Sequence, residues 1–262
     1  MSTSALNIAN VLLKSRRIVI LTGAGMSADS GIATFRFNPD SHWSRFDPME
    51  LASPEGWRAD HRQVWAWYES RRADVLAAAP NAGHMAIVNL ADVLGARTDG
   101  MTRVRVITQN VDNLHERAGS TEVIHLHGSL FAPRCAACHR PGQFSSIAPD
   151  RSAIKVEPPR CSYCRGLIRP GVVWFGEAMP QSEFRMAEDL VDACDAMLVV
   201  GTSGVVYPAA ELPIKAHNMG KFVAEINPEP SVNLEYLSVR WPVTAAQGLP
   251  LLLKHVREAR SN

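Results

Sequence analysis

The chain has 262 residues, of which 46% are hydrophobic and 20% are charged, as is usual for soluble globular proteins. This composition excludes a disordered protein, which would be poor in apolar residues and rich in net charge. The 27 basic and 26 acidic side chains give a formal charge of +1, so we expect no direct binding to nucleic acid or to a membrane surface. Without an apolar stretch of about 20 residues or a secretion signal, we expect a cytoplasmic protein. We also expect a monomer.

Strands and helices are predicted to alternate along most of the chain. A helix over residues 5–14 precedes the strand candidate Arg17–Thr22, whose uninterrupted apolar run is typical of a strand buried on both faces. Similar segments follow in turn, which favours an α/β fold with a doubly wound parallel sheet. The further strand candidates are Val104–Thr108, Glu122–Leu126, Ala196–Val200 and Phe222–Ile226, and the further helical patterns cover residues 83–94, 182–193 and 207–218.

Two segments interrupt this alternation. Residues 36–80 are rich in tryptophan, arginine and proline and contain a helical pattern over Gln63–Ala79, whereas residues 128–175 carry four of the five cysteines. We interpret both segments as insertions that together form a smaller domain. The larger domain is then expected to consist of residues 1–35, 81–127 and 176–262.

A glycine-rich turn, Gly23-Ala24-Gly25-Met26-Ser27-Ala28, follows the first strand candidate. Such a turn lets backbone N–H groups approach a pyrophosphate, although on this motif alone a purely structural turn is an equal alternative. No second strand that ends in an acidic residue follows about 20 residues later, which disfavours an ordinary dinucleotide-dependent dehydrogenase.

The cysteines fall into two C-x-x-C pairs, Cys135 with Cys138 and Cys161 with Cys164, and Cys194 stands alone. Two such pairs are typical of a tetrahedral zinc site. Four thiolates leave no open position for a water molecule, so we predict a structural rather than a catalytic metal. The alternative, a set of reduced core cysteines, would not explain the pairing, whereas Cys194 is expected to be a buried thiol.

Polar residues follow several of the expected strands, at the edge where open α/β sheets bind ligands. Gln109, Asn110 and Asp112 offer hydrogen-bonding groups for a ribose and a carboxamide, although each could also be a turn or cap residue. His125 and His127 follow another strand, and either one could be a general base or a hydrogen-bonded structural residue. The other segments expected at this edge are Gly201–Pro208 and Ile226–Glu229.

The order of the motifs along nearly the whole chain resembles the sirtuins, which are NAD-dependent protein-lysine deacylases. In chain order these motifs are GAGMSADSGIATFR, TQNVDNLH, HLHGS, the paired cysteines, VVWFGE, GTSGVVYPAA and INPE. The resemblance implies a Rossmann-like large domain, a small zinc-binding and helical domain, and an acyl-lysine substrate in the cleft between them. It further implies NAD as co-substrate, one structural Zn²⁺, acyl-lysine-bearing proteins or peptides as partners, and nicotinamide, O-acyl-ADP-ribose and free lysine as products.

The same resemblance assigns roles to individual residues. It selects His127 as the general base, with Asn110 and Asp112 as further catalytic residues. The residues expected beside the substrate peptide are Val172, Val173, Trp174 and Phe175. The residues expected to contact NAD are Gly23, Ala24, Gly25, Ala28, Phe35, Arg36, Gln109, Asn110, Val111, Asp112, Gly201, Thr202, Ser203, Asn227, Pro228, Glu229 and Ala245.

Tyr68 and Arg71 lie three residues apart on a predicted helix and therefore share one face. A guanidinium matches the two oxygens of a carboxylate, although such a pair is by itself more often a solvated helix face. Similar Y-x-x-R pairs mark the sirtuins that remove succinyl, malonyl and glutaryl groups, so the resemblance implies acidic acyl substrates, with acetyl as a further one. Arg72 projects about a quarter-turn away, and Glu69 and Glu177 are expected to be surface or capping residues.

Other functions fit some of the same residues. A sirtuin fold can act predominantly as a deacetylase, or as a protein ADP-ribosyltransferase that passes the ribosyl unit to a protein. His127 and the Tyr68/Arg71 pair favour the deacylase over the transferase. A third alternative is a non-enzymatic zinc module that binds nucleic acid or protein, against which the near-zero charge and the converging strand-end segments argue.

Overall fold

The structure is a computed structural model that describes residues 3–32, 46–97, 101–144, 153–232, 234 and 237–259. Its strands are β1 (Arg17–Thr22), β2 (Arg103–Thr108), β3 (Ile124–His125), β4 (Gly128–Cys135), β5 (Ile168–Val172), β6 (Ala196–Val200), β7 (Phe222–Ile226) and β8 (Val239–Trp241). Its helices are α1 (Thr3–Leu12), α2 (Gly25–Ala28), α3 (Pro48–Leu51), α4 (Pro54–Ala77), α5 (Ala82–Arg97), α6 (Leu114–Ala118), α7 (Gln181–Ala193), α8 (Glu211–Asn218) and α9 (Ala245–Glu258).

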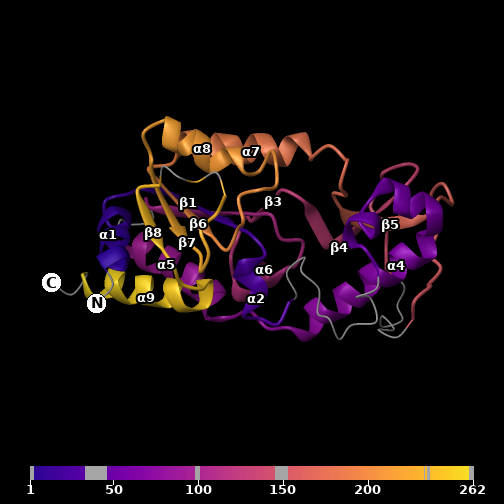
Figure 1. Cartoon of the computed structure of the whole chain (residues 1–262), viewed down its shortest axis with the longest axis horizontal. Helices are drawn as coiled ribbons and strands as arrows, with labels where there is room; N and C mark the ends of the chain where they lie inside the picture. The colour runs from indigo at the N-terminus through magenta and orange to yellow at the C-terminus, as the bar shows by residue number, and fades with distance from the viewer. Residues whose placement is uncertain are drawn as a thin grey trace.

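A six-stranded sheet in the order β3-β2-β1-β6-β7-β8 forms the body of the molecule (Figure 1). All of its strand pairs are parallel, and the first half of the chain supplies one side of the sheet while the second half supplies the other. The direction of the chain order therefore reverses between β1 and β6, which is the position where doubly wound sheets leave a crevice at the carboxyl ends of their strands. This topology confirms the predicted Rossmann-like α/β fold.

Helices cover both faces of this sheet. One hydrophobic core unites alternate residues of the strands, such as Ile20 and Leu198, with α1, α5 and α9, and includes Leu249 of α9. The opposite faces of the same strands, such as Val19 and Val199, pack against α7 and α8 (Figure 1). The apolar runs of β1 and β6 are buried throughout because each face of the sheet has its own helical layer.

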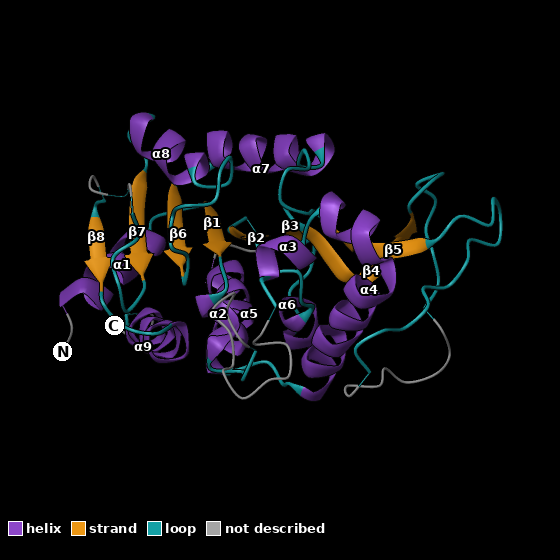
Figure 2. Cartoon of the chain, turned by 45° about the vertical axis from the view of Figure 1, so that its right-hand side comes forward, coloured by secondary structure: helices purple, strands orange, loops and turns teal. Residues whose placement is uncertain are grey.

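A smaller assembly lies beside the sheet, where the antiparallel strands β4 and β5 adjoin the long helix α4 (Figure 2). Val64 and Tyr68 on α4 share a core with Leu130 of β4 and Val172 of β5. Helix α4 is kinked at Asp60, whose φ of −152° and ψ of 86° are not helical. These elements come from the two segments that interrupt the predicted alternation.

Several elements differ from the sequence-based predictions. Strand β8 has three residues and was not predicted, because so short a segment carries no periodic pattern. Helix α9 was also not predicted, because Gly248 and Pro250 lie within it and both residues usually argue against a helix. Strand β3 is limited to two residues, and α8 begins at Glu211 rather than at residue 207.

Among the helices of the described residues, none combines the length and the apolar character needed to cross a lipid bilayer.

The central strand β6 provides a test of the core. Leu198 is 0% exposed and packs in the core with α1, α5 and α9, so the Leu198→Ala variant is expected to lower the free energy of unfolding by about 2–5 kcal/mol because it leaves a cavity. The Leu251→Ala variant on the solvent side of α9, where the side chain is 41% exposed, is the control and should change it by no more than about 0.5 kcal/mol. Urea unfolding followed by circular dichroism measures both, and equal losses would contradict this assignment of the core.

Candidate active site

The backbones of the two turns that follow β1 and β6 are in direct contact. The N–H of Gly23 donates to Val200 O at 3.0 Å, and the N–H of Gly25 donates to Gly201 O at 2.8 Å. A Cβ on Gly23 or on Gly25 would lie 2.8 Å from backbone atoms of Gly201, and Gly201 itself has a φ of +61°. Only glycine is compatible with this approach and this conformation.

The middle residue of the glycine turn differs from its neighbours. Because the N–H groups of Gly23 and Gly25 are used within the protein, they are not available to a ligand. The N–H of Ala24 has no hydrogen-bond partner in the part of the chain that the structure describes. Ala28 is exposed at the end of the short helix α2. The predicted NAD contacts Phe35 and Arg36 lie outside the described residues.

A hydrogen-bond network joins the segment after β2 to the glycine turn. Ser27 Oγ donates to Asp112 Oδ2 at 2.9 Å and accepts from Asn110 Nδ2 at 3.1 Å. Gln109 Nε2 donates to Thr202 Oγ1 at 3.0 Å, which ties the same segment to the turn after β6. Side chains thus connect the segments that follow β1, β2 and β6, as the prediction of a shared crevice requires.

Burial raises the pKa of Asp112 above its ordinary value, while hydrogen bonds from the Leu114 N–H and the Ser27 hydroxyl act in the opposite direction. These hydrogen bonds hold the carboxyl group in place, but they offset only part of the effect of burial on its pKa. Val111, between the two polar residues, is half-buried and packs against the small core of α4, β4 and β5. Its carbonyl accepts from the N–H of Leu130 at 2.8 Å.

The segments after β6 and β7 form the other half of the crevice. Thr202 O accepts from Asn227 Nδ2 at 2.9 Å and from Ser231 Oγ at 2.5 Å. The buried Glu225 carboxylate accepts from the Ser231 N–H at 2.8 Å and pairs with Arg240, which fixes the start of this segment. The residues of the two segments that remain exposed are Ser203, Val205, Val206, Tyr207, Pro228 and Glu229.

Ala245 lies at the first position of α9 and not in a loop. It is 2% exposed, and its carbonyl oxygen would be 2.9 Å from a Cβ on Gly83.

The two histidines of the HLHGS motif have different hydrogen-bond partners. His125 places Nδ1 3.1 Å from Asn110 O and Nε2 2.6 Å from Glu116 Oε1. Since both partners are acceptors, both ring nitrogens must carry protons. Burial lowers the pKa of His125, but the Glu116 carboxylate outweighs this effect and the pKa is raised. His125 is therefore held as a charged donor and is unsuited to accept a proton.

His127 has the arrangement that a general base needs. Its Nδ1 lies 3.0 Å from Gln109 O, and because a carbonyl can only accept, Nδ1 carries the proton and Nε2 keeps its lone pair. Among the described residues Nε2 has no hydrogen-bond partner. Burial lowers the pKa of His127, with the Gln109 carbonyl acting in the opposite direction, so the ring is neutral near pH 7.

Tyr68 and Arg71 share one face of α4, as predicted. The ring of Tyr68 meets Trp67 edge-on at 4.6 Å, and the Arg71 guanidinium carbon lies 5.1 Å from the Trp67 ring centroid. Burial lowers the pKa of Arg71, and the charges of Tyr68, Asp74 and Asp112 act in the opposite direction.

The four paired cysteines meet at the end of β4 and β5. Their Sγ atoms all lie within 4.8 Å of one another, with Cys135 and Cys164 at 3.4 Å and Cys138 and Cys161 at 3.8 Å. A tetrahedral zinc ion with Zn–S bonds of about 2.3 Å needs sulfur atoms about 3.8 Å apart. The donor set and its spacing thus fit a structural Zn²⁺.

Backbone N–H groups prepare these thiols for a cation. The N–H groups of Cys138 and Ala137 approach Cys135 Sγ at 3.5 and 3.4 Å. The N–H of Cys138 is the largest cause that lowers the pKa of Cys135 to about 6. The N–H groups of Cys164 and Tyr163 likewise lower the pKa of Cys161. Cys194 is buried elsewhere, in the core beneath α7, as predicted.

Comparisons with known proteins agree with this geometry. The Sir2 family profile matches residues 23–208. A protein of Corynebacterium efficiens named NAD-dependent protein deacylase 2 is 46% identical over 245 residues, which cover 92% of this chain and 93% of that protein. The chain belongs to the Sir2 family. A Mycolicibacterium paratuberculosis protein named NAD-dependent protein deacylase is 49% identical over 244 residues and covers 92% of this sirtuin and 98% of its own length.

Solved structures of sirtuins have the same fold. A complex of a Sir2 homologue with NAD has a TM-score of 0.86 at 40% identity and covers 97% of this chain and 94% of its own. A mutant Sir2 homologue in complex with 2′-O-acetyl ADP ribose has a TM-score of 0.87 at 39% identity, and the match covers 100% and 99% of the two chains.

Some residues of this sirtuin do not match their predicted surroundings. Glu69 is not a surface residue, because it is buried and makes a bidentate pair with Arg72 at 3.0 and 2.7 Å. Arg72 is turned away from Arg71, with its guanidinium carbon 4.0 Å from the ring centroid of Phe144. Sequence reasoning also missed Ser27, and the signal available was its place inside the glycine motif.

The substrate-side segment differs as well. Strand β5 ends at Val172, so Val173, Trp174 and Phe175 follow it as irregular backbone rather than continuing a strand. Glu177, expected to be a surface or capping residue, is half-buried; it pairs with the buried Arg169 at 2.5 Å and accepts from the Trp174 N–H at 2.9 Å.

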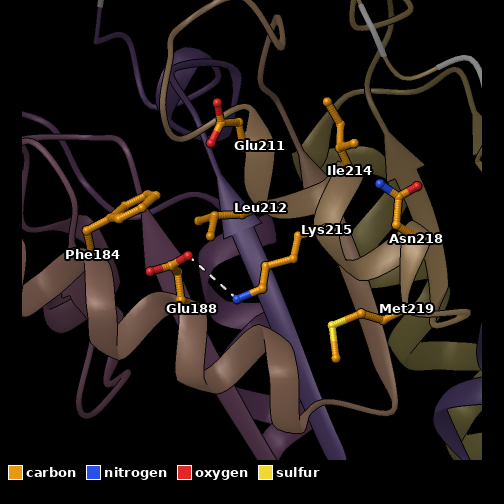
Figure 3. Close-up of a pocket in the computed structure, with 8 residues that line it drawn as sticks. All are labelled: Phe184, Glu188, Glu211, Leu212, Ile214, Lys215, Asn218 and Met219. Carbon is orange, nitrogen blue, oxygen red and sulfur yellow. Dashed lines mark ion pairs between the residues drawn. The ribbon is translucent and has the colours of Figure 1, made fainter.

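A pocket lies between α7 and α8 (Figure 3). Phe184 and Leu212 contribute apolar surface, and Glu188 pairs with Lys215 across the pocket at 3.5 Å. It contains none of the residues predicted to bind NAD or substrate.

The metal site of this sirtuin is tested by a Cys135→Ser variant. Loss of one of four thiolates should release the zinc and lower the melting temperature, because binding of a structural metal is also folding free energy. Zinc content by atomic emission and thermal unfolding by circular dichroism measure these effects. The Cys194→Ser variant is the control and should retain one zinc per chain, and a Cys135→Ser protein that still binds zinc fully would refute the site.

Proposed function

We propose that this sirtuin is an NAD-dependent protein-lysine deacylase. The observation that carries the proposal is the neutral His127, whose Nε2 lone pair has no partner among the described residues and which lies at the strand edge that Ser27, Asn110 and Asp112 share. NAD, when bound, supplies the ribose carbon that takes up the acyl group as nicotinamide leaves. The family membership and the names of the relatives support the same activity.

The residues of the crevice fit a dinucleotide. The uncommitted Ala24 N–H suits a phosphate oxygen, and the polar groups of Gln109, Asn110 and Asp112 suit a ribose and a carboxamide. The adenosine half would lie by Thr202 and Asn227 and the exposed residues that follow them. Gly23, Gly25 and Gly201 would serve by allowing the backbones to approach, not by donating hydrogen bonds.

His127 would act as the general base on a ribose hydroxyl. Its Nδ1–H bond to Gln109 fixes the tautomer, so that Nε2 is the proton acceptor and is oriented by the same segment that would hold the ribose. The zinc would not take part in the chemistry, because four thiolates fill its coordination shell, and its contribution would be to fold β4 and β5.

A direct assay tests the proposal. The purified, zinc-containing protein is incubated with NAD and an acyl-lysine peptide, and mass spectrometry follows the deacylated peptide, nicotinamide and O-acyl-ADP-ribose. All three products should appear in equal amounts and only when NAD is present. Transfer of label from NAD to a protein acceptor without deacylation would indicate an ADP-ribosyltransferase instead.

We further propose that succinyl- and malonyl-lysine are preferred over acetyl-lysine. Tyr68 and Arg71 support this preference, because both lie on one face of α4, beside Trp67, and a guanidinium and a phenol are both donors that suit a carboxylate.

The His127→Ala variant is expected to lose about 10²–10⁴-fold in kcat, because it removes the proton acceptor, while the Kd for NAD changes little. Its comparison is His125→Gln, which should lose much less activity because His125 donates to Asn110 and Glu116 instead. Since burial lowers the pKa of His127, kcat/KM of the wild type should stay level down to about pH 6.5 and fall below it. An acidic limb centred above pH 6.5 would contradict the assignment.

The Arg71→Met variant tests the acyl preference. It should raise KM for succinyl-lysine peptides by about 10-fold or more, as expected for loss of a charged hydrogen-bonding partner, and leave KM for the matched acetyl-lysine peptide nearly unchanged. Arg58→Met, an exposed position on the same helix, is the control and should affect neither. Equal effects on both peptides would refute the specificity role but not the deacylase activity.

A further inference from the structure

A buried ion pair spans the segment that follows β5. Arg169 is 8% exposed and makes a bidentate contact with Glu177, with Nη1 to Oε1 at 2.5 Å and Nη2 to Oε2 at 2.9 Å. Burial raises the pKa of Glu177, but Arg169 and the Trp174 N–H outweigh this effect and the pKa is lowered. The Glu177 carboxylate is therefore ionised at neutral pH. Breaking such a pair leaves an uncompensated buried charge.

The same two side chains hold the backbone between them. Arg169 Nη2 donates to Val172 O at 3.1 Å, and Glu177 Oε2 accepts from the Trp174 N–H at 2.9 Å. The Arg169 guanidinium carbon also lies 3.3 Å from the centroid of the Trp174 ring. Alternate residues of the segment are thus bound on one side by the ion pair.

The other residues of the segment are bound on the opposite side. The Val173 N–H donates to His127 O at 2.9 Å, and the Phe175 N–H donates to Ala52 O at 2.8 Å. The segment expected to receive the substrate peptide is therefore connected through one backbone hydrogen bond to the proposed general base. Its position relative to His127 depends on the ion pair on its far side.

We propose that Arg169 and Glu177 are positioning residues for the acyl-lysine peptide, which hold residues 172–175 at the distance from His127 that the reaction needs. This inference rests on the proposed deacylase function. Neither residue lies among the segments expected to bind NAD. A positioning role predicts a loss for the peptide substrate with little change for NAD, which a general loss of stability would not produce.

The test compares variants in the zinc-loaded, full-length protein. Glu177→Gln keeps the shape but removes the charge, Arg169→Met removes the guanidinium, and Arg169→Lys keeps the charge without the planar fork. The matched control is Arg134→Met. The Arg134 side chain lies 3.9 Å from the same Glu177 carboxylate and is 37% exposed, and none of the described hydrogen bonds joins it to residues 172–175. Steady-state kinetics give KM for a succinyl-lysine peptide, KM for NAD and kcat, and zinc content and circular dichroism confirm folding.

We expect kcat/KM for the peptide to fall about 10–100-fold in Arg169→Met and Glu177→Gln, as for a displacement of the substrate by about 1 Å. Arg169→Lys should recover part of the loss, and KM for NAD should change less than about two-fold. Equal changes in the two KM values, or equal losses in Arg134→Met, would overturn the positioning role. If Arg169→Met does not fold, Glu177→Gln and Arg169→Lys decide. A wild type without NAD-dependent turnover would instead refute the proposed function.

Discussion

The crevice of this protein depends on the close contact between the turns that follow β1 and β6. Two N–H groups of the glycine turn donate hydrogen bonds to the carbonyl oxygens of Val200 and Gly201, and no side chain fits between the two backbones. This contact closes the gap at the point where the chain order of the sheet reverses, so that segments from both halves of the chain face one another. The Ser27, Gln109 and Thr202 hydrogen bonds can then connect three strand ends. Without that approach, the polar residues of the motifs would remain on separate loops.

Side-chain partners, rather than residue type, distinguish the groups of this site. His125 and His127 are two residues apart, yet one faces two acceptors and is held protonated, whereas the other faces a single carbonyl and keeps a lone pair. The same logic applies to the buried ion pair of Arg169 with Glu177, whose oxygens also accept from the backbone. In both cases the hydrogen-bond partners, from side chains as well as from the backbone, determine what an ordinary side chain can do chemically.

The sequence predicted the larger elements well because their patterns are strong. The buried strands β1, β6 and β7 and helix α7 lie within a residue of their predicted limits, since uninterrupted apolar runs and helical spacing identify them. The metal cluster followed from the cysteine spacing. Partnerships that only the fold brings together could not be predicted: Glu177 pairs with Arg169, and Ser27 pairs with Asp112, 85 positions away. Helix α9 was missed because a proline such as Pro250 usually interrupts a helix. In the structure, burial of residues such as Leu249 and Leu252 offsets the free-energy cost of this proline.

The location of α4 has an evolutionary consequence. This helix packs on β4 and β5. Under the proposed assignment, the residues that recognise the acyl group lie on one face of this helix, while those that recognise the dinucleotide lie on the strand ends. Substitutions on a single helical face could therefore alter which modification is removed and leave the nucleotide chemistry intact. New specificities would be accessible to such a protein in small mutational steps.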